Sequence, residues 1–239
     1  MTLLAAYNFD ESSGDVLDRS GNGRDWSLNN SAVRTTPGHT NNGMTKSAGG
    51  GTLPVIAEPA SWMSANQWTI MFWQRYTTIP TTWWFRLYNN GQISGHGFLN
   101  LTNPTHFQFR VRDGATPRSV EVALPPADGS WHHYAGTFDG NVGRVYLDGV
   151  LAGTTAAVSS PVTIDRIDIA EHGTNSFTMD DIRIFDIDLT QEEIETYMNT
   201  PVVDSPAVGT SRSKYYNGSS WVDVTPKFYN GSAWVDTAI

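Results

Sequence analysis

The chain has 239 residues, no cysteine and a formal net charge of −9. The absence of cysteine excludes disulfides, thiolate metal sites and cysteine nucleophiles, and the acidic charge disfavours binding to the phosphates of nucleic acids. No apolar run approaches the roughly 18 residues that cross a bilayer, which argues against membrane insertion.

The first half of the chain alternates between β-type runs and turn-rich segments. The run QWTIMFWQRY (67–76) is nearly apolar on both faces, so it is predicted to be a central strand. HFQFRVRD (106–113) and RSVEVAL (118–124) alternate cleanly, as strands do when one face meets solvent. Further strands are expected over residues 3–9 and 81–89, and a long loop with short strands over residues 29–52.

Two Asp-Gly dipeptides divide residues 131–155 into three predicted strands. Asp-Gly is a strong signal for the tight turn of a β-hairpin. Two more strands are expected over residues 165–172 and 177–189. Roughly a dozen short strands separated by turns favour an all-β fold, a two-sheet antiparallel sandwich of the jelly-roll type.

One helix is predicted near the end of this strand-rich region, in LTQEEIETYM (189–198). Thr190 is the expected N-cap, and Glu193 three residues later completes a capping box. Leu189 before the cap and Ile194 after it form a hydrophobic staple. The helix is expected to span only about two turns.

A Pro-, Ser- and Gly-rich stretch follows this helix, and its composition is typical of a linker. It separates the strand-rich region from a short phrase that occurs twice at the end of the chain. The sequence therefore predicts a jelly-roll domain over residues 1–203, a linker over 204–213 and a tandem aromatic hairpin repeat over 214–239.

Three ordered motifs resemble the laminin G-like domains, which have the concanavalin A-like jelly-roll fold. Residues 3–28 are similar to the aromatic strand, acidic turn and Asp-x-Ser-Gly-Asn-Gly that open these domains, although residues 25–28 depart from the usual Gly-Thr-Leu. WHHYAGTFDGNVGRVYLDGVLAG (131–153) resembles their central segment, and residues 179–198 resemble their closing strand and helix. The resemblance implies an adhesion or carbohydrate-recognition module.

The resemblance also implies a structural calcium ion between the first and last strands. Asp18 and Asp180 are the first candidates for its ligands, with Asp10 and Asn22 next, because Ca²⁺ takes carboxylate, amide and carbonyl oxygens. Alternation places Asp180 on the apolar face of its strand with Ile182, where a carboxylate needs a partner. The alternative is that Asp18 caps its turn and Asp180 accepts backbone hydrogen bonds.

A glycan-binding surface is expected on TTWWFRLYNNGQISGHG (81–97), because sugars stack on exposed aromatic rings and hydrogen-bond to nearby polar groups. Two adjacent tryptophans there point to opposite faces of a strand, so at least one belongs to the core. The candidate ligand-binding residues are Trp83, Trp84, Tyr88 and His96. Three other tryptophans, Trp62, Trp73 and Trp131, are assigned to the core.

No constellation for catalysis is found in the sequence. The Glu-x-Asp-x-x-Glu strand with which glucanases of related fold place two carboxylates on one face is absent. Gly-x-Ser-x-Gly, His-Glu-x-x-His and P-loop motifs are absent too. His133 of WHHY is expected to pack and to hydrogen-bond to the backbone, so the chain is predicted not to be an enzyme.

The duplicated phrase is KYYNGSSWVDVT (214–225) and KFYNGSAWVDTA (227–238). The Asn-Gly dipeptide in each copy predicts a hairpin turn that brings a tyrosine and a tryptophan together across two strands. A hairpin this small does not hold itself together in water, so its aromatic residues need a further surface. That surface is the other copy, the jelly-roll domain or another chain, and in the last case the aromatic residues serve assembly. These residues are Tyr216, Trp221, Tyr229 and Trp234.

The duplicated phrase resembles the tails and linkers of phage tail and capsid-surface proteins. We therefore predict a non-enzymatic bacteriophage virion protein, a minor tail or tail-fibre component. Its jelly-roll domain would bind host-surface glycan, and its repeat would bind other virion proteins or further copies of the chain. The start MTLLAAYNFDE lacks the features of a signal peptide, which favours synthesis in the host cytoplasm and display on the virion surface. The alternatives are a carbohydrate-binding module of a secreted bacterial enzyme or adhesin, a capsid-surface decoration protein, and a glycoside hydrolase.

Overall fold

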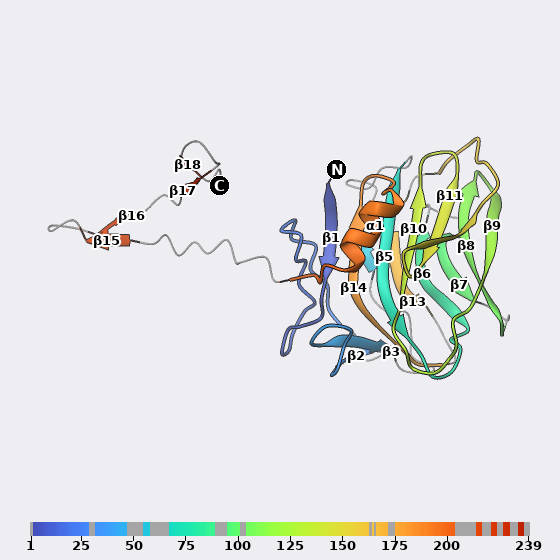
Figure 1. The fold of residues 1–239 in the computed structure, drawn as a ribbon, viewed down its shortest axis with the longest axis horizontal. Helices are drawn as coiled ribbons and strands as arrows, with labels where there is room; N and C mark the ends of the chain where they lie inside the picture. Colours follow the sequence, from blue (N-terminus) through green and yellow to red (C-terminus); the bar gives the residue numbers. More distant parts are fainter. Residues whose placement is uncertain are drawn as a thin grey trace. The chain divides into compact units, whose positions relative to one another are not determined.

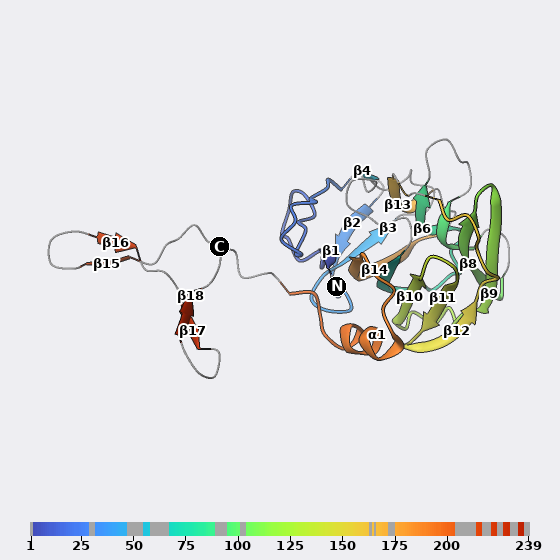
Figure 2. The same ribbon diagram turned by 90° about the horizontal axis from the view of Figure 1, so that it is seen from above.

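The strands before residue 203 form two antiparallel sheets that stack face to face (Figure 1, Figure 2). The chain divides into two compact units, Met1–Val203 (unit 1) and Asp204–Ile239 (unit 2). The computed structural model describes residues 2–28, 32–46, 55–57, 67–88, 95–100, 104–162, 164, 166–171, 175–203, 214–216, 221–223, 227–229 and 234–236.

The larger sheet has eight strands, and β5 lies at its centre, as predicted for residues 67–76. In order across the sheet they are β12 (Val150–Thr154), β11 (Gly143–Leu147), β10 (His132–Phe138), β5 (Trp68–Arg75), β14 (Phe177–Phe185), β3 (Gly43–Lys46) and β2 (Ala32–Thr35). A further strand, β1 (Leu3–Tyr7), pairs with β14 beside this path. The long β14 therefore holds β3 with its first half and β1 with its second half.

The smaller sheet has six strands. In order they are β4 (Val55–Ala57), β13 (Arg166–Glu171), β6 (Thr82–Tyr88), β7 (His96–Asn100), β8 (His106–Asp113) and β9 (Thr116–Ala123). The sequence did not predict β4 or β7. Within β7, Gly97 adopts a positive φ of 117° and continues the strand.

Aromatic rings fill the core between the two sheets. Phe72 of β5 stacks on Phe85 of β6 with ring centroids 5.8 Å apart, and on Tyr134 of β10 at 5.5 Å. Gly136 of β10 leaves room for this packing, because a Cβ atom there would lie 2.3 Å from the Phe109 ring. The predicted all-β fold with two antiparallel sheets is confirmed.

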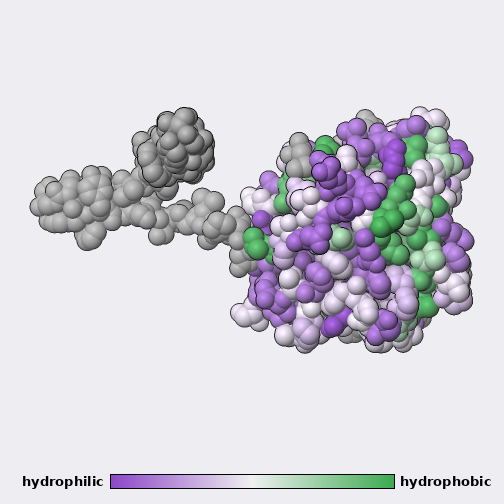
Figure 3. Space-filling view, in the orientation of Figure 1, coloured by the Kyte–Doolittle hydropathy of each residue, from purple (hydrophilic) through white to green (hydrophobic). Residues whose placement is uncertain are grey.

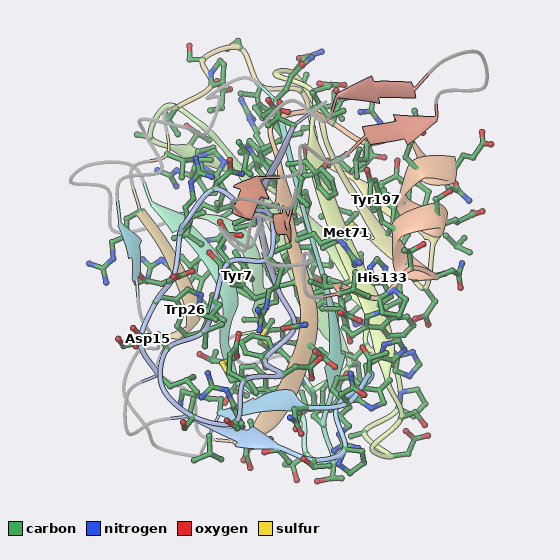
Figure 4. The ribbon with its side chains drawn as sticks, turned by 90° about the vertical axis from the view of Figure 1, so that its left-hand side faces the viewer. Tyr7, Asp15, Trp26, Met71, His133 and Tyr197 are labelled. Carbon is green, nitrogen blue, oxygen red and sulfur yellow. The ribbon has the colours of Figure 1, made fainter. Side chains whose placement is uncertain are left out.

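The turn-rich segment after β1 also contributes to the core. Val16 and Trp26 form an isolated antiparallel bridge. Trp26 is buried edge-on against Tyr7, with ring centroids 5.7 Å apart (Figure 4). Residues 25–28, which depart from the Gly-Thr-Leu of the resembled domains, thus supply a core side chain, Trp26.

A short helix, α1 (Gln191–Met198), follows β14. The Thr190 hydroxyl accepts from the Glu193 backbone N–H, and the Glu193 carboxylate accepts from the Thr190 N–H at 2.8 Å. The predicted capping box is therefore confirmed. Among the described residues, no helix is long and apolar enough to cross a membrane.

The helix covers part of the outer face of the eight-stranded sheet, which is the face turned away from the other sheet (Figure 2). Leu189 and Ile194 form a second, smaller apolar cluster with Met71 of β5 and Phe185 of β14. Figure 4 shows Met71 on the side where Tyr197 of α1 lies. Among the described residues α1 is the one helix, so it leaves the rest of the outer face without a covering helix.

The surface of unit 1 in Figure 3 is mostly polar, with one apolar band. Val150 and Leu151 of the edge strand β12 are 62% and 46% exposed. An edge strand with exposed apolar side chains is suited to pairing with another chain.

Unit 2 contains two separate two-stranded sheets, one in each copy of the repeated phrase. β15 (Lys214–Tyr216) pairs with β16 (Trp221–Asp223), and β17 (Lys227–Tyr229) pairs with β18 (Trp234–Asp236). The backbone register places Tyr216 opposite Trp221, and Tyr229 opposite Trp234. Each copy thus forms one hairpin.

Candidate functional site

The Asp18 carboxylate closes the turn after β1. Its oxygens accept hydrogen bonds from the backbone N–H groups of Ala6 (3.0 Å), Ser20 (3.0 Å) and Arg24 (3.1 Å), and from the Ser20 hydroxyl (2.8 Å). Four donors therefore converge on the two oxygens that the calcium prediction needed. This is the alternative arrangement, in which Asp18 caps its turn.

The other predicted calcium ligands lie in different hydrogen-bond networks. Asn22 turns its side-chain nitrogen toward the carbonyl oxygens of Leu3 (2.9 Å) and Leu4 (3.0 Å). Asp10 accepts from the Asn42 backbone N–H at 2.9 Å. Within the described part of the chain, no three His, Asp or Glu side chains are grouped so that they could hold a metal ion. The four predicted residues do not fit one calcium site.

Asp180 holds the loop between β2 and β3. Its Oδ2 accepts from the backbone N–H groups of His39 (2.8 Å) and Thr40 (3.0 Å), and its Oδ1 accepts from the Asp181 N–H (2.8 Å). Together with Asp10, this carboxylate clamps residues 38–42 against the sandwich. The carboxylates thus position a loop that carries His39.

The side chain of Asp180 lies on the outer face and not on the apolar inner face that alternation predicted. Asp180 pairs with Trp73, and Arg183 pairs with Met71, so three residue steps on β14 oppose two on β5. This β-bulge is made by Asp181, whose φ is +48°. The prediction was wrong because a bulge reverses the alternation.

Asp180 and Asp181 form a buried acidic pair. Burial, followed by the neighbouring Asp181 carboxylate, raises the pKa of Asp180 to about 8, against the opposing effect of its three N–H donors. The Asp181 carboxylate accepts from the Thr40 hydroxyl and from the Val202 backbone N–H, both at 2.8 Å. The pair therefore ties the loop at 38–42 and the end of unit 1 to β14.

Trp84 and His96, two of the predicted ligand-binding residues, are completely buried in the core. Trp84 packs on Phe107, with ring centroids 5.2 Å apart, and His96 lies edge-on to Trp68 at 6.1 Å. Neither ring presents a face to solvent, so the structure assigns both to packing and not to a ligand.

Trp83 lies on the opposite side of its strand from this core, and it is 8% exposed. The guanidinium groups of Arg86 and Arg110 lie 4.8 and 5.4 Å from its ring centroid. Both of these contacts are cation–π interactions. The Tyr88 side chain and residue Trp62 lie outside the described part of the chain.

Trp73 and Trp131, which the sequence assigned to the core, are partly exposed on the outer face. His39 stacks on Trp73 with ring centroids 3.7 Å apart and lies edge-on to Trp131 at 5.8 Å. The Arg75 guanidinium lies 4.9 Å from the Trp131 centroid. We call His39, Trp73, Arg75 and Trp131 the Trp131 cluster.

His133 lies behind this cluster and is 1% exposed. Its ring centroid is 5.2 Å from that of Trp73, and Figure 4 shows it on the side of the sheet where α1 lies. Neither ring nitrogen has a hydrogen-bond partner among the described residues, so the predicted bond to the backbone is absent. Burial lowers the pKa of His133 to about 3.

A pocket of about 260 Å³ adjoins the Trp131 cluster, and Arg75 belongs to both. Its walls come from β3, β5, β14 and the turn before β10. We call it the Arg75 pocket. The residues that give it polar groups or room are Thr45, Arg75, Thr77, Gly129, Ser176 and Thr178.

Three of these residues form one row across the outer face. Thr178 of β14 pairs with Thr45 of β3 on one side and with Arg75 of β5 on the other. The two threonine hydroxyls are 2.8 Å apart. Hydroxyl groups and a guanidinium beside partly exposed indole rings are the groups that bind sugar hydroxyls and the apolar faces of sugar rings.

Comparison with solved structures supports the fold. The binding domain of Paraclostridial Mosquitocidal Protein 1 has a TM-score of 0.65 and 15% identity, covering 83% of this chain and 52% of that one. The receptor binding domain of botulinum neurotoxin C/D mosaic serotype has a TM-score of 0.68 and 13% identity, with 83% and 51% covered. A structure of botulinum neurotoxin type C, whose cell entry depends on interaction with two ganglioside molecules, has a TM-score of 0.63 and 12% identity, also with 83% and 51% covered.

At these identities the likeness shows the fold, and the chain matches only about half the length of each toxin domain. No curated protein sequence matches the chain significantly. The two stacked antiparallel sheets define a concanavalin A-like sandwich. A laminin G model of the concanavalin A-like lectin/glucanase superfamily matches residues 48–195, more than half of the chain, and the chain belongs to this superfamily.

Proposed function

We propose that unit 1 is a non-enzymatic glycan-binding domain and that the glycan binds at the Arg75 pocket beside Trp131. The observation that carries this proposal is the pocket itself, where threonine hydroxyls and a guanidinium adjoin a partly exposed indole ring on the outer face. Membership of a lectin/glucanase superfamily supports it. The described residues of this pocket include no carboxylate, whereas glycoside hydrolysis uses a pair of them.

Replacing Trp131 with alanine is expected to weaken glycan binding by about tenfold or more, because a large aromatic contact at a binding site is worth at least about 1.4 kcal/mol. A glycan array with the full-length chain first identifies a ligand, and calorimetric titration then gives its Kd for each variant. Thermal unfolding of each variant shows whether the fold is retained.

Trp83→Ala is the matched control for this experiment, since it removes a side chain of the same type, a tryptophan, from the six-stranded sheet. We expect Trp83→Ala to leave the affinity within about twofold of the wild type. Loss of binding in Trp83→Ala with retention in Trp131→Ala would move the site to the six-stranded sheet. No binding to any glycan on the array would overturn the proposed function.

We further propose that unit 2 attaches unit 1 to other proteins of a virion, as in a bacteriophage tail or tail fibre. The support is the tandem pair of hairpins, which repeats one small strand unit whose aromatic residues lie opposite each other in register. Such units require a further surface for stability. The resemblance of the phrase to phage tail segments supports a virion surface as the setting.

Deletion of residues 204–239 is expected to leave the melting temperature of unit 1 unchanged, because unit 1 is compact without them. The solution mass, measured by light scattering, is expected to fall from a multimer for residues 1–239 to a monomer for residues 1–203. Equal masses for the two chains would contradict the role of unit 2 in assembly and would favour a monomeric binding module.

A further inference from the structure

We propose that the ligand of the Arg75 pocket is an acidic sugar, whose negatively charged group binds to the Arg75 guanidinium. This inference rests on the proposed function and adds the chemical class of the glycan. Arg75 is the one charged residue among the described residues that line the pocket. The other polar groups of the lining are neutral hydroxyls and backbone groups.

The guanidinium of Arg75 is already held in place. Its Nη2 donates to the Pro37 carbonyl oxygen at 2.8 Å, and the group lies over the Trp131 ring. No carboxylate of the described residues pairs with it, although the whole chain has a net charge of −9. Two of its three nitrogens, Nε and Nη1, make no hydrogen bond within the described part of the chain. A planar guanidinium with free donors binds a carboxylate or sulfate through two parallel hydrogen bonds.

The nearest acidic side chains along the sequence are turned to other partners. Asp128, beside Gly129 of the pocket, is exposed and accepts from the Ser130 backbone N–H at 2.9 Å. Asp180, two residues after Thr178, accepts from three backbone N–H groups. Neither acid forms an ion pair with Arg75 among the described residues, so a ligand anion would compensate its positive charge.

The neighbouring hydroxyls suit the remainder of a sugar ring. The Thr45 and Thr178 hydroxyls share one hydrogen bond, which uses one of their two hydrogens and leaves the other to donate to a ligand. They lie in the same row as Arg75, with neighbouring strands about 5 Å apart. Drug-sized ligands occupy pockets of about 300–1,000 Å³, so a pocket of about 260 Å³ suits one terminal sugar residue.

The test compares matched neutral and acidic monosaccharides on the full-length chain. Glucose is paired with glucuronate, galactose with galacturonate, and glucose with glucose 6-sulfate, and N-acetylneuraminate is added as a second type of carboxylate. Saturation-transfer NMR and calorimetry give the relative affinities. We expect the wild type to prefer an acidic member by about tenfold or more, and the sulfate arm distinguishes a sulfated from a carboxylated sugar.

The variants Arg75→Gln and Arg75→Lys are compared with Arg144→Gln. Arg144 is a matched control because it is ion-paired to Asp139 at 2.8 Å and lies on β11. Arg75→Gln is expected to weaken binding of the acidic sugar by about 10- to 100-fold and to abolish the preference over the neutral partner. Arg75→Lys, which keeps the charge but loses the two-pronged geometry, is expected to be intermediate, and it remains informative if Arg75→Gln fails to fold.

An acidic preference that survives in Arg75→Gln would overturn the assignment of Arg75. Equal binding of neutral and acidic sugars by the wild type would overturn the acidic class and leave the proposed glycan-binding function standing. Failure of the wild type to bind any sugar, on the array or by NMR, would overturn both.

Discussion

Replacing Asp18 with alanine is expected to lower the free energy of unfolding by about 2–4 kcal/mol. The substitution leaves the backbone N–H groups of Ala6, Ser20 and Arg24 without their acceptor. Asp18 is 9% exposed, so water replaces it poorly. For a domain of this size the melting temperature should fall by about 5–10 °C, measured by differential scanning calorimetry.

The same loss is expected in excess Ca²⁺ and in EDTA, because backbone N–H groups donate to both oxygens of the carboxylate. Asp15→Ala removes an exposed carboxylate from the same turn and is the matched control, with an expected change within about 0.5 kcal/mol. Asp18→Asn keeps one acceptor oxygen, so its loss of unfolding free energy should lie between those of Asp18→Ala and Asp15→Ala. A wild-type melting temperature that drops in EDTA, and does not drop further in Asp18→Ala, would show that the carboxylate holds a metal.

The stability of the protein is expected to reach a maximum near pH 6.5 and to fall by about 2 kcal/mol between pH 6.5 and pH 8. The pKa of Asp180 is raised to about 8 in the folded state, whereas an aspartate in the unfolded chain has a pKa of about 3.9. Between these two pKa values the folded state binds one proton more than the unfolded state. The free energy of unfolding therefore falls as the pH rises to about 8. The measurement is the free energy of urea unfolding at intervals of half a pH unit.

Below pH 6.5 the buried histidines make the free energy of unfolding rise with pH, which is opposite to the effect of Asp180. Burial lowers the pKa of His96 and of His133 to about 3, so below pH 6.5 the unfolded chain takes up protons that the folded chain refuses. Stability therefore rises from pH 4 to pH 6.5. Asp180→Asn should flatten the alkaline limb and steepen the acid limb, because the effect of Asp180 spans about pH 4 to pH 8 and opposes that of the histidines below pH 6.5. An unchanged alkaline limb in this variant would contradict the raised pKa of Asp180.

Much of the fold follows from local sequence signals. The run at 67–76 is nearly apolar on both faces because β5 is covered by the core on one side and partly by α1 on the other. β8 and β9 alternate because one face of each meets solvent. The helix begins where Thr190 and Glu193 can satisfy each other's backbone N–H groups.

The candidate site could not be predicted in the same way. Trp73 and Met71 lie two residues apart on one face of β5, and only the extent of α1 decides that Met71 is covered and Trp73 is partly exposed. The face of β14 on which the Asp180 side chain lies depends on the positive φ of Asp181, and no residue pattern predicts that φ. The row of Thr45, Thr178 and Arg75 joins strands far apart in the chain, so only their register reveals it.

The last residues of unit 1 determine how mechanical tension on the chain would enter the sandwich. Val202 is 7% exposed and Val203 is 69% exposed, so the chain leaves the packed interior between them. The Val202 N–H is held by Asp181, and its carbonyl oxygen accepts from the Asn8 side chain at 3.3 Å. A pull from beyond residue 203 therefore loads the bulge of β14, next to the carboxylate that holds the His39 loop. The end of unit 1 and the His39 loop are thus held by two adjacent residues of β14, Asp181 and Asp180.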